Sequence, residues 1–129
     1  MKNPVRFAIA MVVAHLILNF AHGSAHDRLQ IGLTPAELDF VWGDILIAPL
    51  VAAVLLLTKW RRIGAALLTI SMAGAFAFGV YKHFLAAGAD NAFGVAAGTW
   101  GTTFLATSFL LALTEALACW AGIAVLKQK

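Results

Sequence analysis

Four long stretches of apolar residues, separated by short polar segments, dominate this chain. They run over about residues 5–25, 36–58, 63–86 and 98–126. Each is long enough to be a helix of the roughly 20 residues needed to span a hydrocarbon layer of about 30 Å. The connections are too short to hold another domain. The pattern therefore predicts a single domain over residues 1–129, an all-α integral membrane protein folded as an antiparallel, up-down-up-down bundle of four transmembrane helices.

The second apolar stretch carries the clearest local signals. Thr34, Pro35 and Glu37 match the N-cap, the first-turn proline and the capping-box glutamate of a helix start. Pro49 lies inside the same helix and has no N–H to donate, so we expect a kink there. In lipid, the carbonyl that loses its helical partner must find another one within the protein.

Composition and charge support the membrane assignment and add an orientation. Apolar residues make up 62% of the chain, charged residues only 12%, and the mean hydropathy is +0.89. Most of the Lys and Arg residues fall on one predicted side of the bundle, namely Lys2, Arg6, Lys59, Arg61, Arg62, Lys127 and Lys129. The positive-inside rule then places both termini in the cytoplasm, and we expect the inner membrane of a bacterial-type cell. The basic residues form no face that would read a nucleic acid, so the expected partner is the lipid bilayer.

The first apolar stretch has a second interpretation, as a cleaved signal. Lys2 and Arg6 precede it, and the small residues Gly23 and Ser24 follow it, as in a signal peptide with its cleavage site. Polar residues interrupt the apolar region, which favours a retained helix.

One face of the first helix is polar. His15, Asn19, His22 and His26 are spaced by four, three and four residues, which places them above one another on a helix. Polar and ionisable residues inside a membrane are costly, at about 2.5–3.5 kcal/mol for a central Asp, Lys or Arg on insertion scales, and they often mark functional sites. We therefore expect this face to point into the bundle.

Depth along each helix sorts the intramembrane polar residues into two layers. At about 1.5 Å per residue from the basic end, His22 lies near 24 Å, Asp44 near 22 Å and Glu115 near 18 Å. The inner layer contains the residues near this depth: Asn19, His22, Asp44 and Glu115. The outer layer, near about 30 Å, contains His26, Asp39 and His83.

These residues suggest a metal or haem site between helices. The candidate metal ligands are His22, His26, His83, Asp44 and Glu115, with His15, Asn19 and Asp39 as supporting polar residues. Imidazole and carboxylate groups suit Fe, Cu or Zn. No Glu-x-x-His pair or His-Glu-x-x-His motif accompanies them. Only one haem is possible with ligands from two helices, because His83 is the only histidine outside the first helix.

Three other functions remain open. A His–carboxylate pair, such as His22 with Asp44 or Glu115, would serve as an acid and base in an enzyme for a lipid-soluble substrate, given a lateral opening. The polar column from His26 to His15 would also suit translocation of protons or small solutes. Small residues along the third helix, with Ser71, Ala75 and Gly79 at four-residue spacing, favour a homo-oligomer or an accessory subunit of a larger membrane complex. Whether the chain is an enzyme is left open by the sequence.

Overall fold

The computed structural model describes residues 3–128, so Lys2 and Lys129 lie outside the described residues. Within this range the chain forms helices and no strand, in the order α1 (Pro4–Leu29), α2 (Pro35–Phe40), η1 (Val41–Ile47), α3 (Ala48–Leu56), α4 (Arg61–Val80), η2 (Tyr81–Leu85) and α5 (Thr99–Leu126). The two η elements are π-helical, and they continue the α-helices beside them. Together these elements give four helices that are long and apolar enough to cross a membrane. They are Pro4–Leu29, Pro35–Leu56, Arg61–Leu85 and Thr99–Leu126. The prediction of an all-helical chain with four such helices is confirmed.

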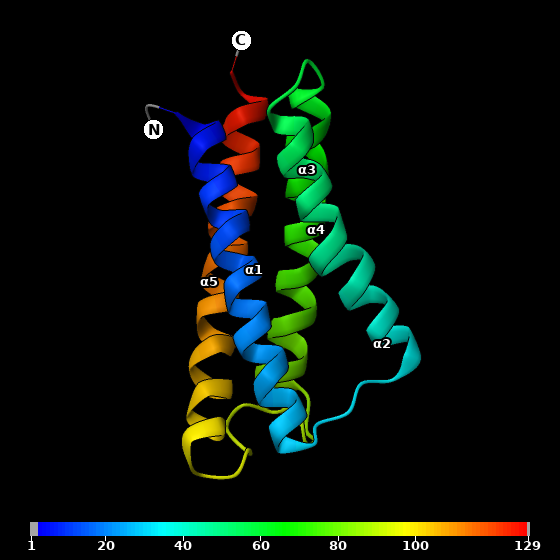
Figure 1. Cartoon of the computed structure of the whole chain (residues 1–129), viewed down its shortest axis with the longest axis vertical. Coiled ribbons are helices and arrows are strands. Elements are labelled where there is room, and N and C mark those ends of the chain that lie inside the picture. Colours follow the sequence, from blue (N-terminus) through cyan, green and yellow to red (C-terminus); the bar gives the residue numbers. More distant parts are fainter. Residues whose placement is uncertain (1–2, 129) are drawn as a thin grey trace.

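The helices pack as neighbours along most of their length. α5 lies between α1 and α4, and α4 also packs against α3. Both described ends of the chain lie at the same end of the molecule as the short link between α3 and α4 (Figure 1). At the opposite end α2 diverges from α1, so the two helices are separated there.

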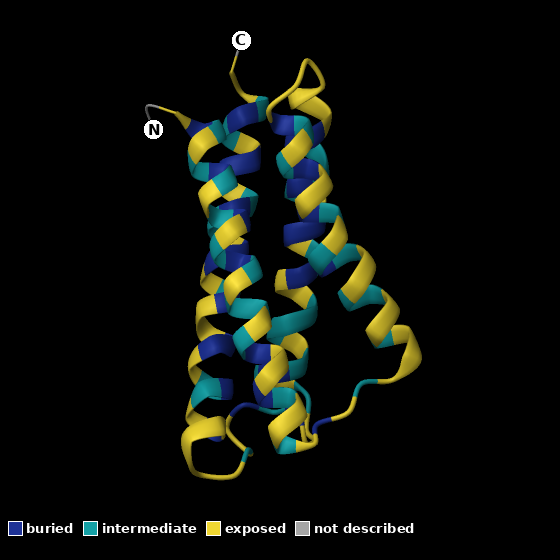
Figure 2. Ribbon diagram, in the orientation of Figure 1, coloured by how far each residue is buried: buried dark blue, intermediate teal, exposed yellow. Residues whose placement is uncertain are grey.

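The larger of the two buried apolar clusters lies at the end that holds the termini. Buried side chains of α1, α3, α4 and α5 form one apolar cluster there, which includes Val12, Leu56, Leu68 and Met72. Buried positions face the neighbouring helices and exposed positions face outward (Figure 2). Large apolar side chains such as Phe20 remain exposed on the outside, which is the distribution that a lipid environment permits.

The irregularity expected at Pro49 takes the form of a π-helix. Helical structure continues through the buried Pro49, but the preceding seven residues, Val41–Ile47, have π-helical geometry. The N–H of Ala48 donates to the carbonyl of Gly43, five residues earlier. A proline cannot donate, and the wider π turn redistributes the hydrogen bonds in front of it. The direction of α2 therefore differs from that of α3 (Figure 1).

The stripe of small residues on α4 is used largely inside this chain. Ser71 and Ala75 are buried within the bundle, and Gly79 faces Glu115 and His83. The closest approaches between helices lie elsewhere, at Gly64 against α3 and at Gly122 against α4. These small residues therefore allow close packing between helices of the same chain.

Candidate metal centre and the cleft beside it

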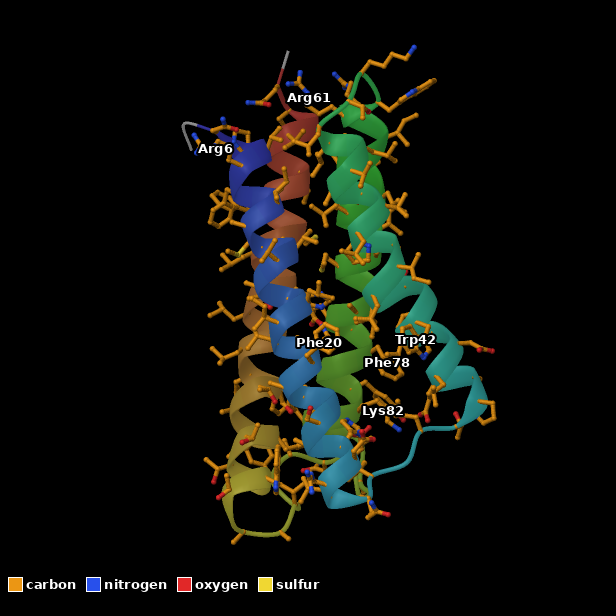
Figure 3. All side chains as sticks on the ribbon, in the orientation of Figure 1. Arg6, Phe20, Trp42, Arg61, Phe78 and Lys82 are labelled. Carbon is orange, nitrogen blue, oxygen red and sulfur yellow. The ribbon has the colours of Figure 1, made fainter. Side chains whose placement is uncertain are left out.

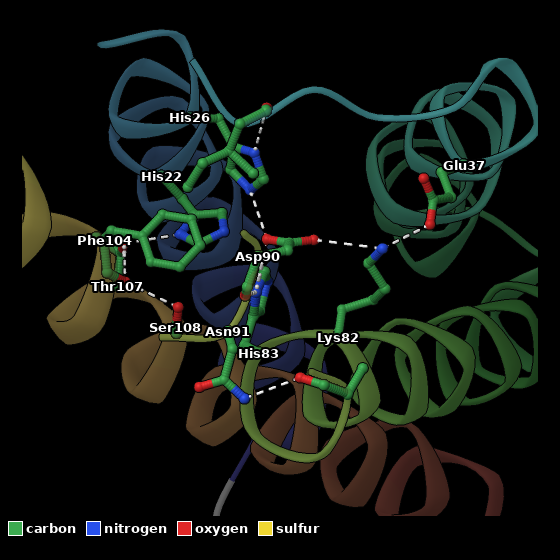
Figure 4. Close-up of polar contacts among 12 residues, drawn as sticks. His22, His26, Glu37, Lys82, His83, Asp90, Asn91, Phe104, Thr107 and Ser108 are labelled. Atoms are coloured by element: carbon green, nitrogen blue, oxygen red, sulfur yellow. Dashed lines mark hydrogen bonds and ion pairs between the residues drawn. The ribbon is translucent and has the colours of Figure 1, made fainter. Parts of the chain in front are cut away.

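Three histidines from two helices converge at the end of the bundle away from the termini. α1 carries His22 and His26, and η2 carries His83. One ring nitrogen from each lies within 4.8 Å of the others. The ring of His22 makes edge contacts with both partners, at centroid distances of 4.8 Å to His26 and 4.7 Å to His83. His22 and His83 are buried and His26 is partly buried, so these three side chains form a group that can hold a metal ion (Figure 4).

The π-helical geometry of η2 contributes to this arrangement. The N–H of Ala86 donates to the carbonyl of Tyr81 over 2.7 Å, a five-residue step that widens the last turn of the helix. Such π turns rotate the following side chains relative to an α-helix and are frequent at functional sites. The turn presents His83 to the two histidines of α1.

Hydrogen bonds to the protein determine the tautomer of His22. Its Nδ1 lies 2.9 Å from Oγ1 of Thr107. The hydroxyl of Thr107 donates to backbone carbonyls of its own helix, at 2.7 Å to Thr103 and 3.1 Å to Phe104. Because its single hydrogen is used there, Oγ1 accepts from His22, and Nδ1 of His22 carries the hydrogen.

His26 and His83 have the same tautomer for a simpler reason. Nδ1 of His26 donates to the carbonyl of Ile31 over 3.1 Å, and Nδ1 of His83 donates to the carbonyl of Asp90 over 3.1 Å. A carbonyl only accepts, so the hydrogen must be on the ring nitrogen. In the neutral form of each ring, Nε2 is therefore the unprotonated nitrogen. This arrangement, in which an acceptor orients each imidazole from behind, is common at metal sites.

Asp90 completes the group and was not among the site residues expected from the sequence. Its Oδ1 lies 3.1 Å from Nδ1 of His83 and 3.4 Å from Nε2 of His26, and its Oδ2 lies 3.7 Å from Nζ of Lys82. The loop is held in place because the N–H of Ala92 donates to the carbonyl of His83 over 2.8 Å. Figure 4 shows the carboxylate between the histidines and the lysine. The available signal was a lone loop carboxylate only seven residues after His83.

Three buried acceptor atoms of this group lack a hydrogen-bond donor. In the part of the chain that the structure describes, the buried side-chain atoms without a hydrogen-bond partner include Nε2 of His22 and both carboxylate oxygens of Asp90. The contacts of the Asp90 carboxylate with His26, His83 and Lys82 are therefore close enough for ion pairs but do not have hydrogen-bond geometry. All three atoms are acceptors, and Phe104, stacked on His22 at a centroid distance of 4.6 Å, closes the site behind them. Buried acceptors without donors are costly, and a cation is one group that would satisfy all of them.

Glu115 belongs to a second polar group. Nε2 of His15 lies 3.2 Å from Oε1 of Glu115, and both residues are buried. The amide of Asn19 donates to the carbonyl of His15 over 2.9 Å and lies 3.1 Å from Nε2 of the same residue. The histidine of α1 that contacts Glu115 is thus His15, whereas His22 contacts Thr107.

The two aspartates of the second span lie away from the histidine group. Asp44 is on η1 against α4, where Oδ2 would lie 2.8 Å from a Cβ added at Gly74. This oxygen is buried and has no hydrogen-bond partner among residues 3–128. Asp39 is exposed on α2. Of the five candidate ligands from the sequence, the structure brings together His22, His26 and His83, and it places Asp44 and Glu115 elsewhere.

A cleft of about 890 Å³ lies beside both polar groups, between α1, the second span and α4. Its apolar walls include Phe20, Leu38, Trp42, Leu46, Leu50 and Phe78. Its polar lining includes Asn19, His22, His26, His83, Asp90 and Glu115. Figure 3 shows Phe20 on α1 and Trp42 on the second span at the two sides of this region, with Phe78 on α4 between them.

Comparisons with protein-family models, with curated proteins and with solved structures found no match to this chain. The class that the fold and site define is an all-helical chain with four candidate membrane-spanning helices and a histidine group that can hold a metal ion.

Proposed function

We propose that this chain is an integral membrane protein that binds one transition-metal ion through His22, His26 and His83. The observation that carries the proposal is the common orientation of the three imidazoles. Each Nδ1 is held by a protein acceptor, and one nitrogen of each ring lies within 4.8 Å of the others. Asp90 lies beside them and would balance the charge of the ion.

The ligand set indicates the kind of metal and its role. Imidazole nitrogens suit Zn, Cu and Fe among the first-row metals. Three protein ligands leave a coordination position for water or another ligand, as in catalytic zinc sites, whereas structural sites usually use four. Because the three histidines also line the cleft, we assign the ion a role in binding or in chemistry.

A bare ion fits this group better than haem does. The rings of His22 and His83 make edge contact at a centroid distance of 4.7 Å. The two axial histidines of a haem lie on opposite faces of the macrocycle, which needs open space between them. The direct ring contact leaves no such space.

The distribution of charge supports an orientation in the membrane. Arg6 and Arg61 lie at the end of the molecule that holds both described termini (Figure 3). Lys59 and Arg62 are close to Arg61 in the sequence, and Lys127 directly follows α5. By the positive-inside rule this end is cytoplasmic, in an up-down-up-down bundle within the cytoplasmic membrane of a bacterial-type cell. The histidine group then lies toward the opposite side. A reporter fused to the C-terminus that is active only in the cytoplasm would test this orientation.

Metal analysis of the detergent-purified protein tests the central proposal. We expect about one ion of Zn, Cu or Fe per chain after incubation with each metal and removal of the excess. His22→Ala should lose the ion. His15→Gln is the matched control, because it changes a buried histidine of the same helix face that lies outside the group. Wild-type protein with full helical circular dichroism that retains none of the three metals would overturn the proposal.

A further inference from the structure

The cleft has an outer wall that this chain leaves uncovered. Leu38, Trp42 and Leu50 on the second span and Phe20 on α1 are 41%, 58%, 42% and 72% exposed. All four line the cleft. Its volume of about 890 Å³ is within the range of about 300–1,000 Å³ that small-molecule sites occupy, and such sites combine apolar walls with a few convergent polar groups.

Glu115 presents a hydrogen-bond acceptor at the inner end of this cleft. His15 engages Oε1 from one side, and no donor to Oε2 is found among residues 3–128. On the other side lies Gly79, where an added Cβ would be 3.8 Å from Oε2 of Glu115 and 3.9 Å from Cδ2 of His83. The missing side chain of Gly79 therefore leaves space between Glu115 and the histidine group.

The charges around this space determine whether a ligand with a charged or a neutral head group would bind there. Glu115 and Asp90 both line the cleft, so in the metal-free protein a carboxylate or phosphate head would meet like charge. The nearest lysine, Lys82, is already paired with Glu37 at 2.7 Å. A neutral hydroxyl would instead donate to Oε2 of Glu115, and an acceptor left unpaired would disfavour molecules that lack a donor.

We propose that the cleft binds a neutral, lipid-soluble molecule whose hydroxyl head donates a hydrogen bond to Glu115 and whose apolar part packs against Phe20 and Trp42. In a membrane-spanning bundle, the uncovered wall faces hydrocarbon, so the ligand enters from the lipid. The site is a binding site distinct from the metal ligands, because Glu115 is outside the histidine group. It rests on the membrane assignment of the proposed function but requires no bound metal.

Fluorescence quenching tests the site with a matched pair of tryptophans. One variant keeps only Trp42 and the other keeps only Trp120, with phenylalanine at the remaining tryptophan positions. The two indoles are similarly exposed, at 58% and 52%, but only Trp42 lines the cleft. Each variant is freed of metal with a chelator, placed in phosphatidylcholine nanodiscs and titrated with a bromine-labelled long-chain alcohol, with the methyl ether of that alcohol, and with the corresponding fatty acid.

We expect the alcohol to quench Trp42 saturably, and several-fold more than Trp120, whereas the ether and the acid quench both indoles alike. Glu115→Gln should weaken the saturable quenching about tenfold, because a neutral amide oxygen is a weaker acceptor than a carboxylate. Gly79→Val should remove it by filling the space beside Glu115. Quenching of Trp42 in the His22→Ala background should persist, which separates this site from the metal site.

Three results would overturn the proposal. The first is equal quenching of Trp42 and Trp120 by the alcohol. The second is saturable quenching of Trp42 by the ether or the acid as strong as that by the alcohol. The third is weaker quenching of Trp42 than of Trp120, with protection that increases with the number of chains per nanodisc. That last result would show that a second copy of the chain covers the cleft.

Discussion

The side chain of Thr107 on α5 determines which nitrogen of His22 faces the histidine group. Its Oγ1 accepts from Nδ1 of His22 over 2.9 Å while its hydroxyl donates to its own helix backbone. The lone pair of His22 is therefore on Nε2, which is buried and has no partner within the described range. A hydroxyl on a neighbouring helix thus prepares His22 to act as a ligand.

Thr107→Val should weaken metal binding and leave the fold intact. Valine has a similar shape but no acceptor, so the orientation and tautomer of His22 lose their support. Loss of such an outer-shell partner typically costs about 10–100-fold in metal affinity. A competition titration with a chromophoric chelator measures the change. Thr114→Val is the matched control, since Thr114 also donates to carbonyls of α5 but has no hydrogen bond to a histidine within residues 3–128; equal affinities for the two variants would contradict the role of Thr107.

The ion pair between Lys82 and Glu37 links η2 to the diverging end of the second span. Nζ of Lys82 lies 2.7 Å from Oε1 of Glu37, and both side chains are about one-fifth exposed. We expect Lys82→Met to accelerate backbone hydrogen exchange over residues 35–40 by roughly two- to fivefold, which corresponds to about 0.5–1 kcal/mol. Mass spectrometry of the protein in detergent measures this. Lys59→Met removes a lysine from the opposite end of the bundle and should leave the same peptide unchanged.

The buried pair of His15 and Glu115 should show strong energetic coupling. His15→Leu leaves the carboxyl group of Glu115 buried without its hydrogen-bond partner, and such an unsatisfied group costs about 1–3 kcal/mol. The double variant His15→Leu/Glu115→Leu removes both polar groups and should recover most of that loss. Unfolding in mixed detergent, followed by circular dichroism, gives the free energy of each variant. Additive effects of the two single substitutions would show that the pair is not coupled.

Hydropathy and helix periodicity were sufficient for the four long helices and for the polar face of α1. They fix where a residue lies along a helix, but they do not fix the rotation of that helix about its axis. His22 and Asp44 have nearly equal calculated depths, yet Asp44 faces Gly74 on α4 while His22 contacts Thr107 on α5. α2 and η1 also diverge from α1, which increases the separation between Asp44 and His22. The extent of this divergence depends on the π-helical turns before Pro49.

Asp90 could not be placed from the sequence, because its position depends on how the loop after η2 folds. The chain returns toward the helix end, where backbone atoms of Ala92 and His83 form a hydrogen bond. A count of depth along helices does not describe such a return. The sequence does mark Asp90 in one way. It is the only carboxylate between the span that contains Glu37 and the span that contains Glu115, and it lies outside the helices.

Gly64 allows α4 to approach the backbone of α3, and its replacement should destabilise the bundle. A Cβ at this position would lie 2.8 Å from the carbonyl oxygen of Ala52, from Cβ of Leu55 and from the amide nitrogen of Leu56. Two of these are backbone atoms, so α3 must shift as a whole, and we expect Gly64→Ala to cost about 1–3 kcal/mol. Gly23→Ala is the control, because it is also helical but has nothing within 4 Å of the added Cβ. The higher helix propensity of alanine should stabilise that variant by about 0.5–1 kcal/mol. The unfolding free energies of the Gly64→Ala and Gly23→Ala variants are compared in detergent. Equal values for the two variants would show that α3 and α4 are not in close contact at Gly64.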